Sequence, residues 1–220
     1  METVMVFAPH PDDDIIGCGG SIARHVQQGK PVSIVYMSSG EAGSLQHKSE
    51  DLARLREGEA TAAAHSLGVT DLTFLHFPDG YLEFNKESLG CIVTLIRAKK
   101  PILIYLPHSH DAVPDHQITN RLVLEGCRRA AGPWFPEYGK EAWQIKTVFG
   151  YEIWTPLQSV GYSENISSFM SDKLAALRMH KSQIDGIAYD QAIQGLNRYR
   201  GIMTGKGDYC ECFQLIQAQI

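Results

Sequence analysis

The chain has 220 residues, of which 44% are hydrophobic, and its 20 basic and 25 acidic side chains give a formal net charge of −5 at pH 7. That length fits one folded domain, so we expect residues 1–220 to form a single domain. The mild acidity argues against a nucleic-acid-binding protein, which would present a basic surface. No apolar run approaches the roughly 18 residues of a membrane span, and the first residues, METVMVF, lack the basic leader of a signal peptide.

Five cysteines are spread over the chain without a CxxC pair: Cys18, Cys91, Cys127, Cys210 and Cys212. An odd number of scattered cysteines is typical of free thiols in a reducing compartment, and not of a disulfide framework or a zinc ribbon. We therefore predict a cytoplasmic protein with neither a membrane span nor a nucleic-acid partner.

Strands and helices are predicted to alternate in the first part of the chain. Short apolar, β-branched runs predict strands at 3–8, 31–37, 72–77 and 102–106. Helical patterns occur at about 21–26, 50–67 and 86–99, and again from Asp115 onward. This alternation is typical of a parallel sheet with right-handed crossovers. The predicted fold class is α/β: a Rossmann-like three-layer α/β/α sandwich with a mainly parallel sheet.

The last third of the sequence is less regular. It predicts a strand at 147–154 and helices at about 168–180 and 191–200. All three tryptophans, Trp134, Trp143 and Trp154, fall in this part of the chain. We expect residues 132–220 to wrap back on the sheet and to wall the active site.

The most informative residues follow the first predicted strand directly: His10, Asp12, Asp13 and Asp14. Loops after the carboxyl ends of parallel strands share one rim of the sheet, and ligands bind there. Adjacent carboxylates repel one another unless a positive charge offsets them, which a divalent metal does most simply. Catalytic zinc takes histidine nitrogen and carboxylate oxygen from three protein ligands and keeps one position open. His10 and Asp13, three residues apart across a proline-containing turn, are predicted to bind one ion.

A third ligand is expected from the loop after the predicted strand at 102–106, which supplies His108, His110, Asp111, Asp115 and His116. His116 is the best choice because it opens a helix, which fixes its backbone. Asp12 would then point away from the ion. A metal lowers the pKa of its bound water, and a nearby carboxylate that is not a ligand can take the proton, so Asp12 is predicted to be the general base. This arrangement favours hydrolysis of an amide or ester.

Three glycines, Gly17, Gly19 and Gly20, follow the acidic turn. Their GxGG spacing is not the dinucleotide-binding fingerprint, and the carboxylates that precede them would repel a pyrophosphate. We therefore exclude a nucleotide site here.

The segment APHPDDDIIGCGGSIA at 8–23 resembles the signature of the PIG-L / LmbE-like zinc N-deacetylases. The similarity continues along the chain at 39–41, Arg56 and Glu59, 111–116, 152–154, Lys173, 182–183 and 197–201. The resemblance implies that His10, Asp13 and His116 hold Zn²⁺, or another divalent metal, and that Asp12 is the base. These are the roles that the residues themselves favour.

Two positions depart from the family pattern. Asp14 stands where the family usually has glutamate, and Val113 stands where related enzymes have a histidine that is thought to stabilise the oxyanion. Valine cannot donate a hydrogen bond, and losing such a donor costs about 2.7–4 kcal/mol of transition-state stabilisation. We predict that His110, in the same loop, takes over this catalytic role, with His108 as the less favoured alternative.

Further polar residues are predicted to support the site. Arg56, Glu41 and Asp79 are candidates for substrate binding, with a buried Arg56–Glu59 ion pair and exposed turn residues as the respective alternatives. Glu59 falls between Leu55 and Ala62 on the expected apolar stripe of its helix.

Three aspartates, Asp14, Asp111 and Asp115, are expected to orient the ligands from behind, with an N-cap role as the alternative for Asp115.

The predicted function is a metal-dependent hydrolase that removes an N-acetyl group from an N-acetylglucosamine-type sugar or conjugate. The alternatives are a catalytically weak metal- and carbohydrate-binding protein, which Val113 favours, and a metal-dependent amidase on a non-sugar substrate. A phosphoesterase is disfavoured because the sequence offers no second complete ligand set. The expected partner is a small amino-sugar conjugate, and homo-oligomer formation is left open.

Overall fold

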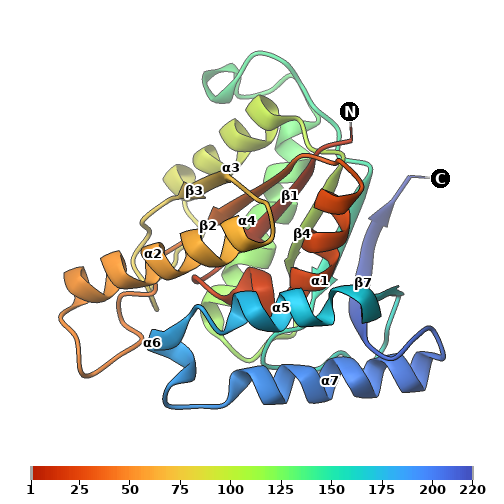
Figure 1. The fold of residues 1–220 in the computed structure, drawn as a ribbon. Helices are drawn as coiled ribbons and strands as arrows, with labels where there is room; N and C mark the ends of the chain where they lie inside the picture. The colour runs from red at the N-terminus through yellow and green to blue at the C-terminus, as the bar shows by residue number, and fades with distance from the viewer. Residues whose placement is uncertain (1, 220) are drawn as a thin grey trace.

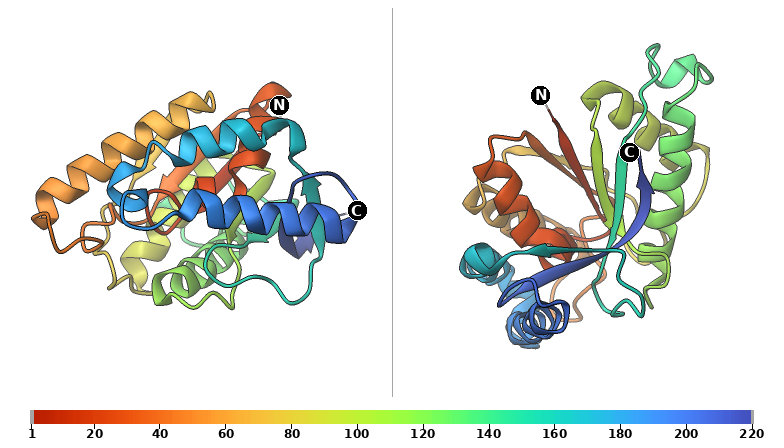
Figure 2. Two further views of the ribbon diagram at one scale, coloured as in Figure 1. Left: turned by 60° about the horizontal axis from the view of Figure 1, so that its bottom comes forward. Right: turned by 90° about the vertical axis from the view of Figure 1, so that its right-hand side faces the viewer.

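The computed structural model describes residues 2–219. A seven-stranded sheet has the strand order β3-β2-β1-β4-β5-β7-β6, and helices cover both of its faces (Figures 1 and 2). The strands are β1 (Val4–Ala8), β2 (Val32–Tyr36), β3 (Asp71–Phe74), β4 (Leu103–Pro107), β5 (Thr147–Tyr151), β6 (Tyr162–Asn165) and β7 (Cys210–Ala218). The α-helices are α1 (Asp13–Gln27), α2 (Ser49–Ser66), α3 (Lys86–Lys99), α4 (Pro114–Ala130), α5 (Met170–Leu177), α6 (Lys181–Ile184) and α7 (Tyr189–Thr204). Two short 3-10 helices are η1 (Pro136–Tyr138) and η2 (Ser167–Phe169).

The first five strands are parallel and the last two are not. β1 pairs with β2 and β4, β2 with β3, and β4 with β5, all in parallel. β7 runs antiparallel to both β5 and β6. The predicted α/β sandwich with a mainly parallel sheet is confirmed.

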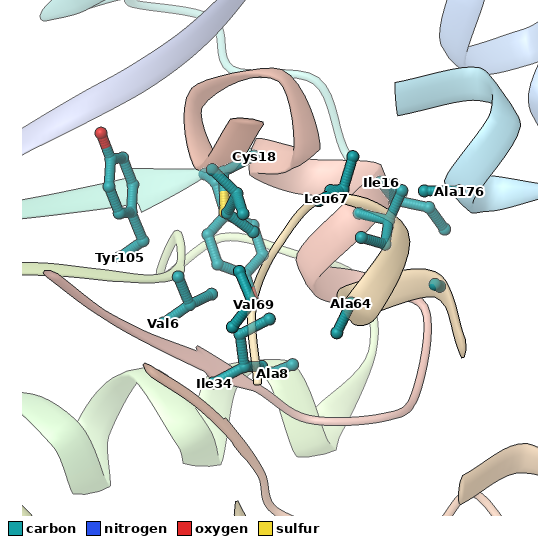
Figure 3. Close-up of a cluster of buried hydrophobic side chains, with 14 of the residues drawn as sticks. Val6, Ala8, Ile16, Cys18, Ile34, Ala64, Leu67, Val69, Tyr105 and Ala176 are labelled. Atoms are coloured by element: carbon teal, nitrogen blue, oxygen red, sulfur yellow. The ribbon is translucent and has the colours of Figure 1, made fainter. Parts of the chain in front are cut away.

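Two apolar cores flank the sheet. One lies under α1, α2 and α5 and includes Val6, Ile16, Ile34 and Ala64 (Figure 3). The other lies under α3 and α4 on the opposite face. β1, β2 and β4 are buried on both faces, as the continuous apolar runs of parallel strands require.

The C-terminal part completes the sheet and covers α1. α5 packs against α1 and α2, and α7 packs against β7. β6 and β7 were not predicted, and the helix expected at 168–180 is shorter, because η2 and α5 cover only 167–177. None of the helices within residues 2–219 combines the length and the apolar character needed to cross a membrane.

Candidate active site

The site lies where the strand order reverses. β1 sits between β2 and β4, so the crossovers leave it in opposite directions and the loops after β1 and β4 meet at one rim. The first loop carries His10 and Asp13, which stands at the start of α1. The second loop leads into α4, and His116 lies in its first turn.

Three ligand atoms from the two loops converge on one point. Asp13 Oδ2 is 3.1 Å from His10 Nδ1 and 3.3 Å from His116 Nε2. His10 Nδ1 and His116 Nε2 are themselves 3.3 Å apart. A tetrahedral ion with ligand bonds of about 2.0–2.1 Å separates its ligand atoms by about 3.3 Å. The spacing of these three atoms therefore fits a divalent metal, and both the element types and the geometry match a zinc-like donor set.

The nitrogens that face away from this point have carboxylate partners. His116 Nδ1 is 3.0 Å from Asp111 Oδ1. His10 Nε2 is 3.0 Å from Asp79 Oδ1 and 3.3 Å from Asp115 Oδ2. A carboxylate behind a ligand histidine fixes its tautomer and increases its basicity. Asp111 and Asp115 thus lie where an orienting residue is needed, and Asp79 joins them.

The carboxylates of the cluster stabilise positive charge beside them. Burial alone would lower the pKa of His10, but hydrogen bonds to Asp115, Asp13 and Asp79 raise it well above its usual value. Burial would likewise lower the pKa of His116, yet Asp13 and Asp111 raise it to about 9. The two imidazoles in turn hold the pKa of Asp13 well below its usual value despite its burial. Positive charge is therefore stabilised between these carboxylates, whether protons or a metal ion provide it.

Asp12 lies beside the ligands without joining them. Its side chain is buried, and its backbone has a φ of 123° and a ψ of −29°, a strained conformation for a residue other than glycine. Burial raises the pKa of its carboxyl group to about 7, although the Arg56 guanidinium opposes the shift. A carboxylate with a pKa near the working pH is well suited to take and return a proton.

Arg56 connects the loop after β1 to the loop after β2, beside Asp12. Its Nη2 donates to Pro11 O at 2.7 Å and lies 3.5 Å from Asp12 Oδ2, while its Nη1 donates to Gly40 O at 2.9 Å. Gly40 has a φ of 67°, and a Cβ there would lie 2.1 Å from Arg56 Nη1, so only glycine fits. The alternative of an Arg56–Glu59 ion pair is wrong, because Glu59 instead accepts from the backbone N–H and hydroxyl of Ser182.

The buried stripe of α2 includes Leu52 and Ala63 as expected, but it does not include Leu55 or Ala62. Arg56 is buried on it, whereas Leu55 is 40% exposed. The guanidinium can be buried at this position because it donates hydrogen bonds to the backbone carbonyls of Gly40 and Pro11.

Asp111 and Asp115 accept hydrogen bonds from backbone N–H groups in addition to their contacts with the histidines. Asp111 Oδ2 accepts from the N–H groups of Trp154 and Thr155. Asp115 accepts from the N–H groups of Gly80 and Leu82. The N-cap of α4 is Val113, so the alternative N-cap role of Asp115 is wrong.

Glu41 and Asp79 tie two loops to each other. Glu41 Oε1 accepts from Asp79 N at 2.9 Å, and Asp79 Oδ2 accepts from Ala42 N at 2.8 Å. Asp14 points into the protein, where it accepts from the Tyr36 hydroxyl at 3.0 Å. Burial raises the pKa of Asp14 to about 7.

Comparison with known proteins identifies the family. Residues 5–127 match the family model PIG-L, described as GlcNAc-PI de-N-acetylase. The diacetylchitobiose deacetylase of Thermococcus kodakarensis is 31% identical over 217 residues, which cover 93% of this chain and 80% of that protein. The chain belongs to the PIG-L family.

Solved structures extend the likeness to the whole fold. The N,N'-diacetylchitobiose deacetylase of Pyrococcus horikoshii superposes with a TM-score of 0.89 at 26% identity, over 98% of this chain and 84% of that one. The 4-carboxy-2-hydroxymuconate hydratase of Pseudomonas putida KT2440 superposes with a TM-score of 0.91, over 100% and 98% of the two chains, but at only 22% identity. The second likeness concerns the fold alone, and it shows that this architecture carries more than one named activity.

This PIG-L chain places His110 apart from the ligand cluster. His110 is exposed and lines a separate pocket with His108, Thr155 and Pro156. His108 is buried, and both of its nitrogens face backbone groups: Nδ1 accepts from His110 N at 3.1 Å, and Nε2 lies 2.7 Å from Thr155 O. The structure therefore does not bring His110 to the pocket around His10.

The pocket beside the ligands has a volume of about 190 Å³. It is lined by His10, Asp12, Asp13, Gly43, Arg56, Asp79, Trp154, Gln183 and Tyr189. Gln183 and Tyr189 were not predicted as site residues, and Trp154 was predicted only as part of the segment 132–220 that walls the site. The motif residues at 152–154 and 182–183 were the available signal, whereas Tyr189 had none.

A second group of potential ligand atoms shares His10. His10, Asp79 and Asp115 also bring ligand atoms within 4.8 Å of one another, on the Nε2 side of the imidazole. Both groups use the imidazole of His10, so the second group is not an independent metal site, and the two groups together do not make a separate pair of metal sites.

Proposed function

We propose that this chain is a divalent-metal-dependent N-deacetylase that acts on an N-acetylglucosamine-type sugar or conjugate. The observation that carries the proposal is the convergence of His10 Nδ1, Asp13 Oδ2 and His116 Nε2 within 3.3 Å of one another, beside the buried carboxylate of Asp12. The deacetylase names of the relatives support the reaction, and their diacetylchitobiose substrates support an acetamido sugar.

His10, Asp13 and His116 would hold the ion, which we propose to be zinc or a similar divalent metal. Such an ion polarises the acetamido carbonyl and makes water more acidic. Asp12 takes the proton of the attacking water and later returns it to the departing amine. Arg56 holds Asp12 in place for both transfers, because it donates to the carbonyl of the preceding residue, Pro11.

Tyr189 is the donor that we propose in place of the histidine absent at Val113. Its side chain lines the pocket and packs against Trp154 at an interplanar angle of 49°, with ring centroids 4.8 Å apart. Burial and the nearby Asp12 carboxylate raise the pKa of Tyr189, so its hydroxyl stays protonated and can donate to a developing oxyanion. A Tyr189→Phe variant should lose about 10²- to 10³-fold in kcat while its zinc affinity is unchanged.

Glu41 and Asp79 have positions that suit contact with sugar hydroxyls. Each carboxylate already accepts a hydrogen bond from a backbone N–H of the other's loop, so we propose that their main role is to fix the shape of the pocket rim. All five cysteines are free thiols, which supports the proposed reducing, cytoplasmic location.

Acetate release tests the proposal. Metal-stripped protein should release none from diacetylchitobiose or from other N-acetylglucosamine conjugates, and zinc should restore release. An N-acetylated alkylamine serves as the non-sugar substrate. Turnover of the alkylamine alone would favour a non-sugar amidase. Sugar binding without acetate release from any compound would favour the weak binding protein.

A further inference from the structure

Helix α1 is interrupted one turn after the site residues. Cys18 has a φ of −147° and a ψ of 23°, which breaks the helix into a first turn and a longer second part. In an unbroken helix the N–H of Gly20 would donate to Ile16 O. Here Gly20 N donates to Glu211 Oε1 at 2.8 Å, and Ile16 O accepts from Lys173 Nζ at 2.8 Å. An ion pair from elsewhere in the chain is thus inserted into the helix.

Lys173 and Glu211 come from α5 and β7 and are both buried, at 0% and 1% exposure. Their charged atoms are 2.7 Å apart. Glu211 Oε2 also accepts from the N–H and hydroxyl of Ser21, at 2.8 and 2.6 Å. The cation therefore lies at the carboxyl end of the first turn and the anion at the amino end of the second part, which complements both helix dipoles. Figure 1 shows α5 crossing close to the beginning of α1, and the two helices are in contact.

The first turn of α1 connects this pair to the site. Asp12 O accepts from the N–H groups of Ile15 and Ile16, so Ile16 is bonded to Asp12 at its nitrogen and to Lys173 at its oxygen. The same turn carries Asp13. Gly17 closes it against β5, because a Cβ there would lie 2.1 Å from the ring of Tyr151.

We propose that Lys173 and Glu211 are positioning residues for the metal site. They hold the first turn of α1 separately from the rest of the helix and so set where Asp12 and Asp13 stand relative to His116. The GxGG segment is the sequence counterpart of this break. The inference rests on the proposed function for its metal, but it concerns residues that touch neither metal nor substrate.

A purely structural role is the competing explanation, because a buried ion pair that loses one partner is strongly destabilising wherever it lies. Arg97 is the matched control. It lies on α3, is also buried, at 4% exposure, and donates to Arg129 O, which is roughly 20 Å along α4 from His116. Its guanidinium donates to the carbonyls of Arg129, Gly132, Trp134, Phe135 and Gly139.

The test compares Lys173→Met with Arg97→Met in the full chain, below the Tm of each variant. We would measure zinc affinity by titration and the visible spectrum of the Co²⁺-loaded protein, which reports ligand geometry. We expect Lys173→Met to bind zinc about tenfold more weakly, with an altered cobalt spectrum. Arg97→Met should lower Tm and leave both properties unchanged.

Wild-type affinity and spectrum in a folded Lys173→Met protein would overturn the proposal, as would equal losses in both variants. If Lys173→Met does not fold, Ser21→Ala removes one hydrogen bond to Glu211 and keeps both charges. It should weaken zinc binding about twofold or more, because Glu211 then holds the start of the second part of α1 with one hydrogen bond fewer. An unchanged affinity in Ser21→Ala would also overturn it. Wild-type protein that binds no zinc would instead refute the proposed function.

Discussion

Two histidine pairs on the same rim of the sheet differ in what their nitrogens face. His10 and His116 each have one nitrogen near Asp13 Oδ2 and the other near a further carboxylate. His108 has both nitrogens near backbone groups, whereas His110 is exposed and forms hydrogen bonds with its neighbours Ser109 and His108. A histidine suits metal binding when a carboxylate orients it and one nitrogen points to a shared centre. Residue type and loop position do not decide this.

Removing a ligand should have the largest effect. His116→Ala deletes one of the three converging atoms, so saturable zinc binding should be lost and kcat/KM should fall about 10³-fold or more. Equilibrium dialysis with metal analysis and an acetate-release assay would measure both. If the His116→Ala variant still binds one zinc per chain, the distinction between the two histidine pairs is wrong.

Removing the base should separate chemistry from metal binding. Asp12→Asn keeps the shape of the side chain but cannot take a proton, so kcat should fall about 10²- to 10⁴-fold while zinc affinity stays near the wild-type value. Steady-state kinetics and zinc titration on the same preparation check this. Loss of zinc together with activity would mean that Asp12 is a ligand.

Removing the carboxylate behind a ligand should have an intermediate effect. Asp111→Asn leaves an oxygen for the N–H groups of Trp154 and Thr155 but no charge for His116. Zinc affinity should drop about 10- to 100-fold. His108→Ala is the matched variant from the other pair, and its zinc affinity should be unchanged in competitive titration with a chelating dye. Equal losses in the two variants would contradict the distinction between the pairs.

His110→Ala should have the smallest effect. The side chain is exposed and lines a different pocket, so kcat and KM should each change by no more than about twofold, within the small range typical of exposed positions. A fall of about 10²-fold would restore the sequence-based prediction that His110 stabilises the oxyanion.

The sequence predicted the parallel part of the sheet, and it predicted that His10, Asp13 and His116 lie close together. Continuous apolar runs marked β1, β2 and β4, and the positions of His10, Asp13 and His116 at strand ends and a helix start placed them on one rim. The parts that it missed depend on tertiary contacts. β7 begins with four buried residues, one of them the charged Glu211, whose carboxylate has its partners in the distant residues Gly20, Ser21 and Lys173.

Arg56 and His110 both show that a sequence does not reveal which groups a side chain will contact. The partners of Arg56 are the carbonyls of Pro11 and Gly40, and backbone partners leave no mark in a sequence. His110 shares a loop with His116, but its place in that loop, between Ser109 and the buried Asp111, turns it outward. Nearness in sequence therefore did not predict nearness in space.

The most direct test of the central claim is anomalous diffraction at the zinc absorption edge from crystals of the zinc-loaded protein. The account predicts one strong peak, about 2.0–2.2 Å from His10 Nδ1, Asp13 Oδ2 and His116 Nε2. A peak bound instead by His10 Nε2, Asp79 and Asp115, or no peak within reach of His116, would contradict it.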